Sequence, residues 1–207
     1  VALSLTLLLT SAVSTPAAAA VFIVNNTQDI PEATPGNGTC NPVGAVGNTC
    51  TLRAAIMEAN ALPGSHTILI ASGTYPLTRA GNGEENALNG DLDIKAPITI
   101  SNLTSNPPML FGNHQDRLFD IHPNGALTIF NMALSGGFAN APNNTRGGAF
   151  NVQPGGSLSL ERVVVASNVA NIGGAIYNDG NVTIVDSEFF NNALFDDQVL
   201  SSLVDGT

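Results

Sequence analysis

The chain has 207 residues, with six Lys and Arg against sixteen Asp and Glu, which gives a formal net charge of -10 at pH 7. Charged residues make up only 11% of the chain, against roughly 25% in ordinary globular domains. The acidic balance repels phosphate backbones and anionic lipid headgroups, so we expect neither nucleic acid nor an anionic membrane surface as a partner. The length is sufficient for one domain with a sizeable core.

An apolar run over residues 2–13 opens the chain and is too short to span a bilayer. A small-residue segment at 15–20 follows and offers an Ala-x-Ala cleavage site before Val21. This order predicts a signal peptide over residues 1–20, and with it a secreted or cell-surface/outer-membrane protein. The alternative is a buried core helix, but the strand-like segment VFIV directly after Ala20 favours the signal peptide.

Cys40 and Cys50 are ten positions apart in a loop rich in Gly and Asn. In an oxidising compartment such a pair favours a disulfide, with two free thiols as the alternative. No His is adjacent, so the pair falls short of a zinc set.

The stretch from Cys50 to Asn60, CTLRAAIMEAN, has the spacing of a short amphipathic helix of about nine residues. Thr51 is the expected N-cap, Pro63-Gly64 stops the helix, and Arg53 and Glu58 are expected towards its flank. The apolar face is expected to cover one end of the fold, and it consists of Leu52, Ala55, Ile56 and Ala59. We therefore assign residues 21–64 to an N-terminal strand, a disulfide loop and a capping helix.

The segment CTLRAAI from Cys50, followed by EANA and then PG, resembles the bacterial CSLREA domain. The likeness extends from Val21 to about Ile100, through TILI at 67–70 and GDLDI at 90–94. The resemblance implies an exported β-helix protein. The family usually has Glu where this chain has Ala54, so the capping box is incomplete here.

Beyond the helix, apolar segments recur with a period typical of stacked supersecondary units. The repeat places Leu77, Ile100, Ile129, Leu160 and Ile184 at equivalent positions. Two further columns join Leu127, Leu158 and Val182, and Leu134, Val165 and Phe189. This pattern predicts an all-β fold, a right-handed parallel β-helix of about five rungs over residues 65–192.

A second short strand is expected before each of the last three units, at Phe119, Phe150 and Ile176. Gly125, Gly156 and Gly180 are expected in turns that use positive φ. An antiparallel β-sandwich is the alternative, but its hairpins would not need columns kept in register over three repeats.

Two pairs of glycines, Gly147-Gly148 and Gly173-Gly174, precede Ala and an apolar residue. These segments resemble the GGA element of polymorphic outer-membrane protein repeats, and FFNN at 189–192 contains that family's F-x-x-N motif. We expect Phe189 to fill the core. Asn192, Asn168 and Gly137 share a column, which we interpret as a left-handed turn position.

The tail at 193–207 breaks the repeat, so a truncation point is expected there. Relatives of this kind generally continue to a surface anchor or a membrane-embedded barrel. We expect membrane association only through such an anchor, and self-association through the apolar face and strand edges of the last rung.

Catalytic candidates are few. Parallel β-helix lyases use carboxylate-bound calcium and an Arg or Lys, and the residues that could supply these groups are Asp91, Asp93, Asp116, Arg117 and Asp120. We interpret Asp91 and Asp93 instead as solvated positions on one strand face. Asp196 and Asp197 are adjacent and unsuited to a carboxylate pair. The histidines His66, His114 and His122 are isolated in the sequence and have no metal-ligand spacing.

Two functions follow from these features. The first is a non-catalytic, adhesin-like scaffold that presents the loops 80–89 and 138–145 to an extracellular ligand, a host surface or a polysaccharide. It needs no cofactor or metal. The second is a pectate-lyase-like polysaccharide lyase or glycoside hydrolase that acts on acidic polysaccharide. The lyase would require calcium.

Overall fold

The computed structural model describes residues 19–142 and 145–195, which form one helix and eighteen strands. The helix is α1 (Leu52–Ala61). Most of the predicted signal peptide and tail, together with Asp196 and Asp197, lie outside the described residues.

The strands form four sheets, and the largest contains β1 (Val21–Val24), β2 (His66–Ile70), β5 (Pro97–Asn102), β8 (Ala126–Phe130), β12 (Ser157–Glu161) and β16 (Asn181–Val185). A five-stranded sheet contains β3 (Thr74–Pro76), β6 (Met109–Phe111), β9 (Ala133–Ser135), β13 (Val164–Ala166) and β17 (Glu188–Phe190). A four-stranded sheet contains β4 (Leu92–Ile94), β7 (Phe119–Ile121), β11 (Phe150–Val152) and β15 (Ile176–Asn178). The smallest sheet contains β10 (Phe138–Ala139), β14 (Val169–Ala170) and β18 (Ala193–Leu194).

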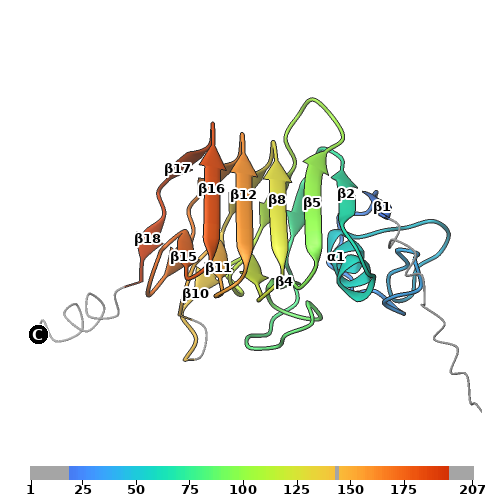
Figure 1. Ribbon diagram of the computed structural model, residues 1–207, viewed down its shortest axis with the longest axis horizontal. Helices are drawn as coiled ribbons and strands as arrows, with labels where there is room; N and C mark the ends of the chain where they lie inside the picture. Colours follow the sequence, from blue (N-terminus) through green and yellow to red (C-terminus); the bar gives the residue numbers. More distant parts are fainter. Residues whose placement is uncertain (1–18, 143–144, 196–207) are drawn as a thin grey trace, which may run out of the picture.

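All pairs among these described strands are parallel, and in every sheet the strands follow one another in chain order. Figure 1 shows the six strands of the largest sheet side by side along the long axis of the molecule. From β2 onward, successive strands of one sheet are separated in the chain by strands of the others, and α1 lies between β1 and β2. This arrangement contradicts the antiparallel sandwich, because hairpin-connected neighbours would run in opposite directions.

The predicted columns are confirmed in the later repeats. Leu127 aligns with Leu158 and Val182, and Leu134 aligns with Val165 and Phe189. The predicted place of Leu77 is wrong. Ile68 aligns with Ile100, so the earlier spacing is longer than expected. Leu77 directly follows β3 and therefore belongs to a different sheet from Ile100.

The core lies between the sheets and is filled by the alternate, inward side chains of the strands. Its largest fully buried aromatic side chains are Phe119 and Phe150, whose rings stack with centroids 5.5 Å apart. Phe189 was expected in this core, but it is 38% exposed. It belongs to the last described strand of its sheet, so no further aligned side chain covers it among the described residues.

The helix α1 contacts β1, β2 and β4 and is buried on all sides from Leu52 to Ala59. Thr51 is its N-cap and accepts a hydrogen bond from the Ala54 amide. Arg53 and Glu58, predicted towards the flank of the apolar face, are both buried. The polypeptide before the helix wraps around it and supplies the partners of Glu58, and it shares those of Arg53 with the loop before β4.

That wrapping segment contains the Cys40–Cys50 disulfide. The Glu58 carboxylate accepts hydrogen bonds from the amides of Gly36, at 2.7 Å, and of Gly38. A buried carboxylate needs such donors. The disulfide loop and the helix are therefore tied together through a polar contact as well as through the apolar face that the sequence predicts.

Positive φ occurs at positions other than those predicted. Gly125, Gly156 and Gly180 do not have it, and in the Asn192 column it belongs to the preceding residues, Gly136, Ser167 and Asn191. An added Cβ at Gly125 would overlap the Ile94 carbonyl oxygen, so close approach between repeats requires this glycine. The asparagines form a ladder instead: buried Asn168 accepts from the Gly137 amide and donates to Asn192 Oδ1.

Replacing Gly147 with alanine is expected to lower the free energy of unfolding by about 1–3 kcal/mol. Gly147 has a φ of +65°, and its Cβ would overlap the Phe150 carbonyl oxygen. Gly83→Ala is a matched control, since Gly83 has a φ of +72° but nothing within 4 Å of the Cβ position. Urea unfolding followed by circular dichroism measures both variants. Equal losses would contradict a role in close packing.

Candidate functional site

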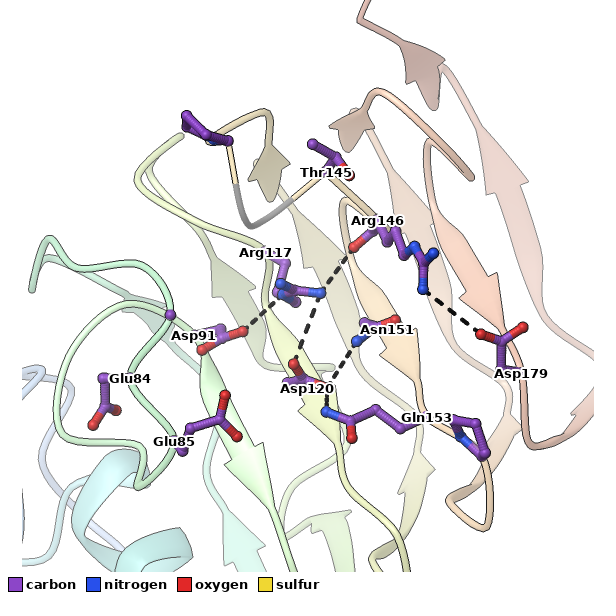
Figure 2. Close-up of a pocket in the computed structure, with 13 residues that line it drawn as sticks. Glu84, Glu85, Asp91, Arg117, Asp120, Thr145, Arg146, Asn151, Gln153 and Asp179 are labelled. Atoms are coloured by element: carbon purple, nitrogen blue, oxygen red, sulfur yellow. Dashed lines mark hydrogen bonds and ion pairs between the residues drawn. The ribbon is translucent and has the colours of Figure 1, made fainter.

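A polar pocket of about 420 Å³ lies over β7 and β11, between the loop that precedes β4 and the loop that follows β10. Figure 2 shows Glu84 and Glu85 on one side of it and Thr145 and Arg146 on another. The lining consists of Gly83, Glu84, Glu85, Asp91, Arg117, Asp120, Pro142, Thr145, Arg146, Asn151, Gln153, Pro154 and Asp179. Both loops proposed for display therefore border one pocket.

Strand alternation explains why the floor is polar. In β7 the aromatic side chain of Phe119 and the aliphatic side chain of Ile121 are buried, so Asp120 between them points to the opposite face. The parallel register then aligns Asp120 with Asn151 on β11 and with Asp93 on β4. One outward column thus supplies carboxylates and an amide at successive levels.

Arg117 is held at three points. Its Nε lies 2.8 Å from Asp91 Oδ2, its Nη1 lies 3.8 Å from Asp120 Oδ2, and Nη1 donates to the Arg146 carbonyl oxygen at 3.0 Å (Figure 2). The residue is 6% exposed. The guanidinium is thereby fixed and largely neutralised within the floor of the pocket.

The Asp120 carboxylate also orders two side-chain amides beside Arg117. Asp120 Oδ1 accepts from Asn151 Nδ2 at 3.0 Å and from Gln153 Nε2 at 2.9 Å. At the far side, the Arg146 guanidinium lies 4.5 Å from the centroid of the Tyr177 ring and its Nη1 lies 3.8 Å from Asp179 Oδ2. These contacts preorganise donors and acceptors facing the pocket.

The lining contains five carboxylates and two guanidinium groups, so its charge is negative. Burial raises the pKa of Asp91 well above its ordinary value of 3.8. The negative charges of Asp116, Asp93 and Asp120 raise it further, and these effects outweigh the opposing Arg117. The pocket therefore disfavours anionic ligands even where Asp91 is protonated.

The five acidic and basic residues singled out from the sequence converge, but the interpretation of Asp91 and Asp93 as solvated positions is wrong. They are 4% and 1% exposed. The loop 80–89, expected to project for display, folds over them, and the Ala87 amide donates to Asp93 Oδ2 at 2.6 Å. Asp116 is also buried and lies outside the pocket lining; its Oδ1 accepts from the Arg117 amide at 2.7 Å.

His122 is not isolated. Its Nε2 lies 2.6 Å from Asp93 Oδ1, and its Nδ1 lies 3.4 Å from Glu85 Oε2. Burial lowers its pKa, but the hydrogen bond and charge of Asp93, with the charges of Asp120 and Glu85, raise the pKa overall. Sequence reasoning missed this cluster because its members are far apart in the chain.

The other two histidines have structural surroundings. His66 is buried in β2, where its Nδ1 accepts from the Ala20 amide at 3.1 Å. His114 is exposed, and its ring packs edge-on against Phe111 and Phe138. Neither ring lines the pocket.

Comparison of the chain with protein-family models, with curated proteins and with solved structures finds no match. Within the described ranges, the structure contains no helix with the length and apolarity that crossing a membrane requires.

Proposed function

We propose that the chain is a secreted or cell-surface right-handed parallel β-helix, capped by α1, that acts as a non-catalytic binding module. The parallel registers that align residues 100, 129, 160 and 184 support the β-helix. The Cys40–Cys50 disulfide supports an oxidising compartment. The resemblance to CSLREA domains and to polymorphic outer-membrane protein repeats supports export and an adhesin-like role.

The ligand is an uncharged extracellular glycan, and the observation that carries this proposal is the preorganised polar pocket between the two long loops. Its volume is in the range of small-ligand sites. The amides of Asn151 and Gln153 and the surrounding carboxylates offer the donors and acceptors that sugar hydroxyls require. The excess of carboxylates disfavours polyuronates and other acidic polysaccharides.

The lyase alternative has less support from the same contacts. A lyase base has to reach the substrate proton, whereas Arg117 is buried and engaged by Asp91, Asp120 and a carbonyl oxygen. Calcium takes about six to eight oxygen ligands. The oxygens of Asp120 are committed to Arg117 and to two amides.

Calorimetric titration of the full chain with neutral glucan, xylan and N-acetylated chitin oligosaccharides tests glycan binding. We expect at least one neutral series to bind and polygalacturonate to bind at least about 10-fold more weakly. Asn151→Ala and Gln153→Ala are each expected to weaken binding about 10-fold. Gln28→Ala, an exposed polar residue outside the pocket, is the control and should leave affinity unchanged.

The same protein is incubated with polygalacturonate and calcium while the absorbance of unsaturated product is followed. We expect no turnover. Turnover that is lost in Asp91→Ala or Arg117→Ala would overturn the non-catalytic assignment. Failure of all three neutral series to bind would contradict the choice of ligand.

A further inference from the structure

Three potential metal ligands meet beside the pocket, where the loop before β4 crosses the outer face of β4 and β7. One ligand atom each from Glu85, Asp93 and His122 lies within 4.8 Å of the others. Asp93 is 1% and His122 is 8% exposed, whereas the Glu85 side chain is 61% exposed. Two members are therefore fixed in the protein and the third is free to adjust.

We propose that Glu85, Asp93 and His122 bind a divalent transition-metal ion, for which Zn²⁺ is the best match. Zinc sites with an open position combine three protein ligands, drawn from imidazole nitrogen and carboxylate oxygen, with a water molecule. The imidazole favours a transition metal over calcium, which prefers a larger set of oxygens.

The distances agree with this assignment after Glu85 moves inward and His122 Nε2 and Asp93 Oδ1, now 2.6 Å apart, separate by about 1 Å. Two ligands of one tetrahedral zinc ion lie about 3.4 Å apart, given metal–ligand distances of about 2.0–2.2 Å. The widest separation in the cluster is 4.8 Å or less. Glu85 is exposed and belongs to a loop, so its carboxylate can close this gap, and the ion replaces the direct contact between His122 Nε2 and Asp93 Oδ1.

The surroundings fix the two buried ligands. The Ala87 amide donates to Asp93 Oδ2 at 2.6 Å, which leaves Oδ1 directed at His122. The His122 amide donates to the Ile94 carbonyl oxygen at 3.0 Å, and its own carbonyl oxygen accepts from the Gly125 amide at 2.9 Å. The Ala87 contact orients the Asp93 carboxylate, as contacts to metal ligands generally do, and the two backbone bonds fix the main chain that carries His122.

Metal binding has a structural consequence for the neighbouring pocket. The loop is attached to β4 through the Ala87–Asp93 hydrogen bond, and the ion adds a second attachment through Glu85. Glu84 and Glu85 line the pocket, so the ion fixes that wall. The proposal of metal binding stands whether or not the pocket binds a glycan.

Calorimetric titration of the metal-free full chain with Zn²⁺ and with Ca²⁺ tests the proposal. We expect one Zn²⁺ per chain at this site and Ca²⁺ at least about 10-fold weaker. Glu85→Gln and His122→Ala are each expected to weaken Zn²⁺ binding at least 10-fold. The controls are Glu188→Gln and His114→Ala, an exposed carboxylate and an exposed histidine outside the pocket and the cluster, and both should retain wild-type affinity.

Thermal unfolding supplies a second measurement, since a ligand that binds only the folded state raises the melting temperature. Zn²⁺ should raise it in the wild type and in both controls but not in Glu85→Gln, whose exposed side chain can be changed without loss of the fold. Unchanged affinity in Glu85→Gln and His122→Ala, equal losses in the controls, or tighter binding of Ca²⁺ than of Zn²⁺ would each overturn the proposal.

Discussion

Replacing Arg53 with methionine is expected to lower the free energy of unfolding by about 3–5 kcal/mol, because it removes one partner of a buried ion pair. Arg53 Nε lies 2.5 Å from Asp29 Oδ1, and the two side chains are 0% and 1% exposed. The guanidinium also donates to the carbonyl oxygens of Ala87, at 2.8 Å, and Gly90, at 2.7 Å. The Arg53 side chain thus joins α1 to the loop before β4, which borders the pocket.

Methionine retains the apolar stem of arginine but leaves the Asp29 carboxylate without its cation and the carbonyl oxygens without donors. Arg162→Met is the matched control. Arg162 pairs with Glu161 at the surface, where its side chain is 56% exposed, and its loss should cost less than about 1 kcal/mol. Chemical unfolding of both variants distinguishes the two cases. A loss for Arg53→Met no larger than that of the control would contradict this account of the buried pair.

The sequence predicted most accurately the features that depend on one strand at a time. Alternation of apolar and polar residues identified β8, β12 and β16, and the columns at Ile129 and Leu160 agree with the observed register. Parallel neighbours in register place like side chains over like, so alignment of the repeats carried three-dimensional information. Leu77 was misplaced because it directly follows β3, in another sheet, whereas Ile68 on β2 occupies the column of Ile100.

The features that the sequence did not predict depend on segments folding over one another. Arg53 and Glu58 were expected towards the flank of the helix and Asp93 on a solvated strand face, and all three are buried. Alternation says which face a residue occupies, but not whether another segment covers that face. Here the disulfide loop covers α1 and the loop 80–89 covers β4.

Two members of the cluster proposed to bind metal, Asp93 and His122, could have been found from the register. Asp93 aligns with Asp120 on the neighbouring strand, and His122 lies two residues beyond Asp120, so it shares that outward face. A diagonal neighbour in a parallel pair is within reach of a long side chain. Glu85 gave no such signal, because its position depends on the path of the loop.

The stability of the protein is expected to fall as the pH rises through the range in which Asp91 ionises. Burial first, and then the charges of Asp116, Asp93 and Asp120, raise the pKa of Asp91 well above 3.8 in the folded protein. Between the ordinary pKa and this raised value, the folded state binds more protons than the unfolded state. Stability then decreases with pH, by up to about 1.4 kcal/mol per pH unit for one group, and the decrease ends above the raised pKa.

Asp91→Asn removes the titrating group while keeping an oxygen that can accept from Arg117, so its free energy of unfolding should lack this decrease. The difference between the two proteins is measured by urea unfolding at intervals from pH 3.5 to pH 8. Asp186→Asn, in an exposed turn, is the control and should follow the wild type. If the free energy of unfolding of the wild type instead rises with pH relative to that of Asp91→Asn, Arg117 holds the pKa of Asp91 below its ordinary value. The floor of the pocket would then carry a permanent carboxylate charge.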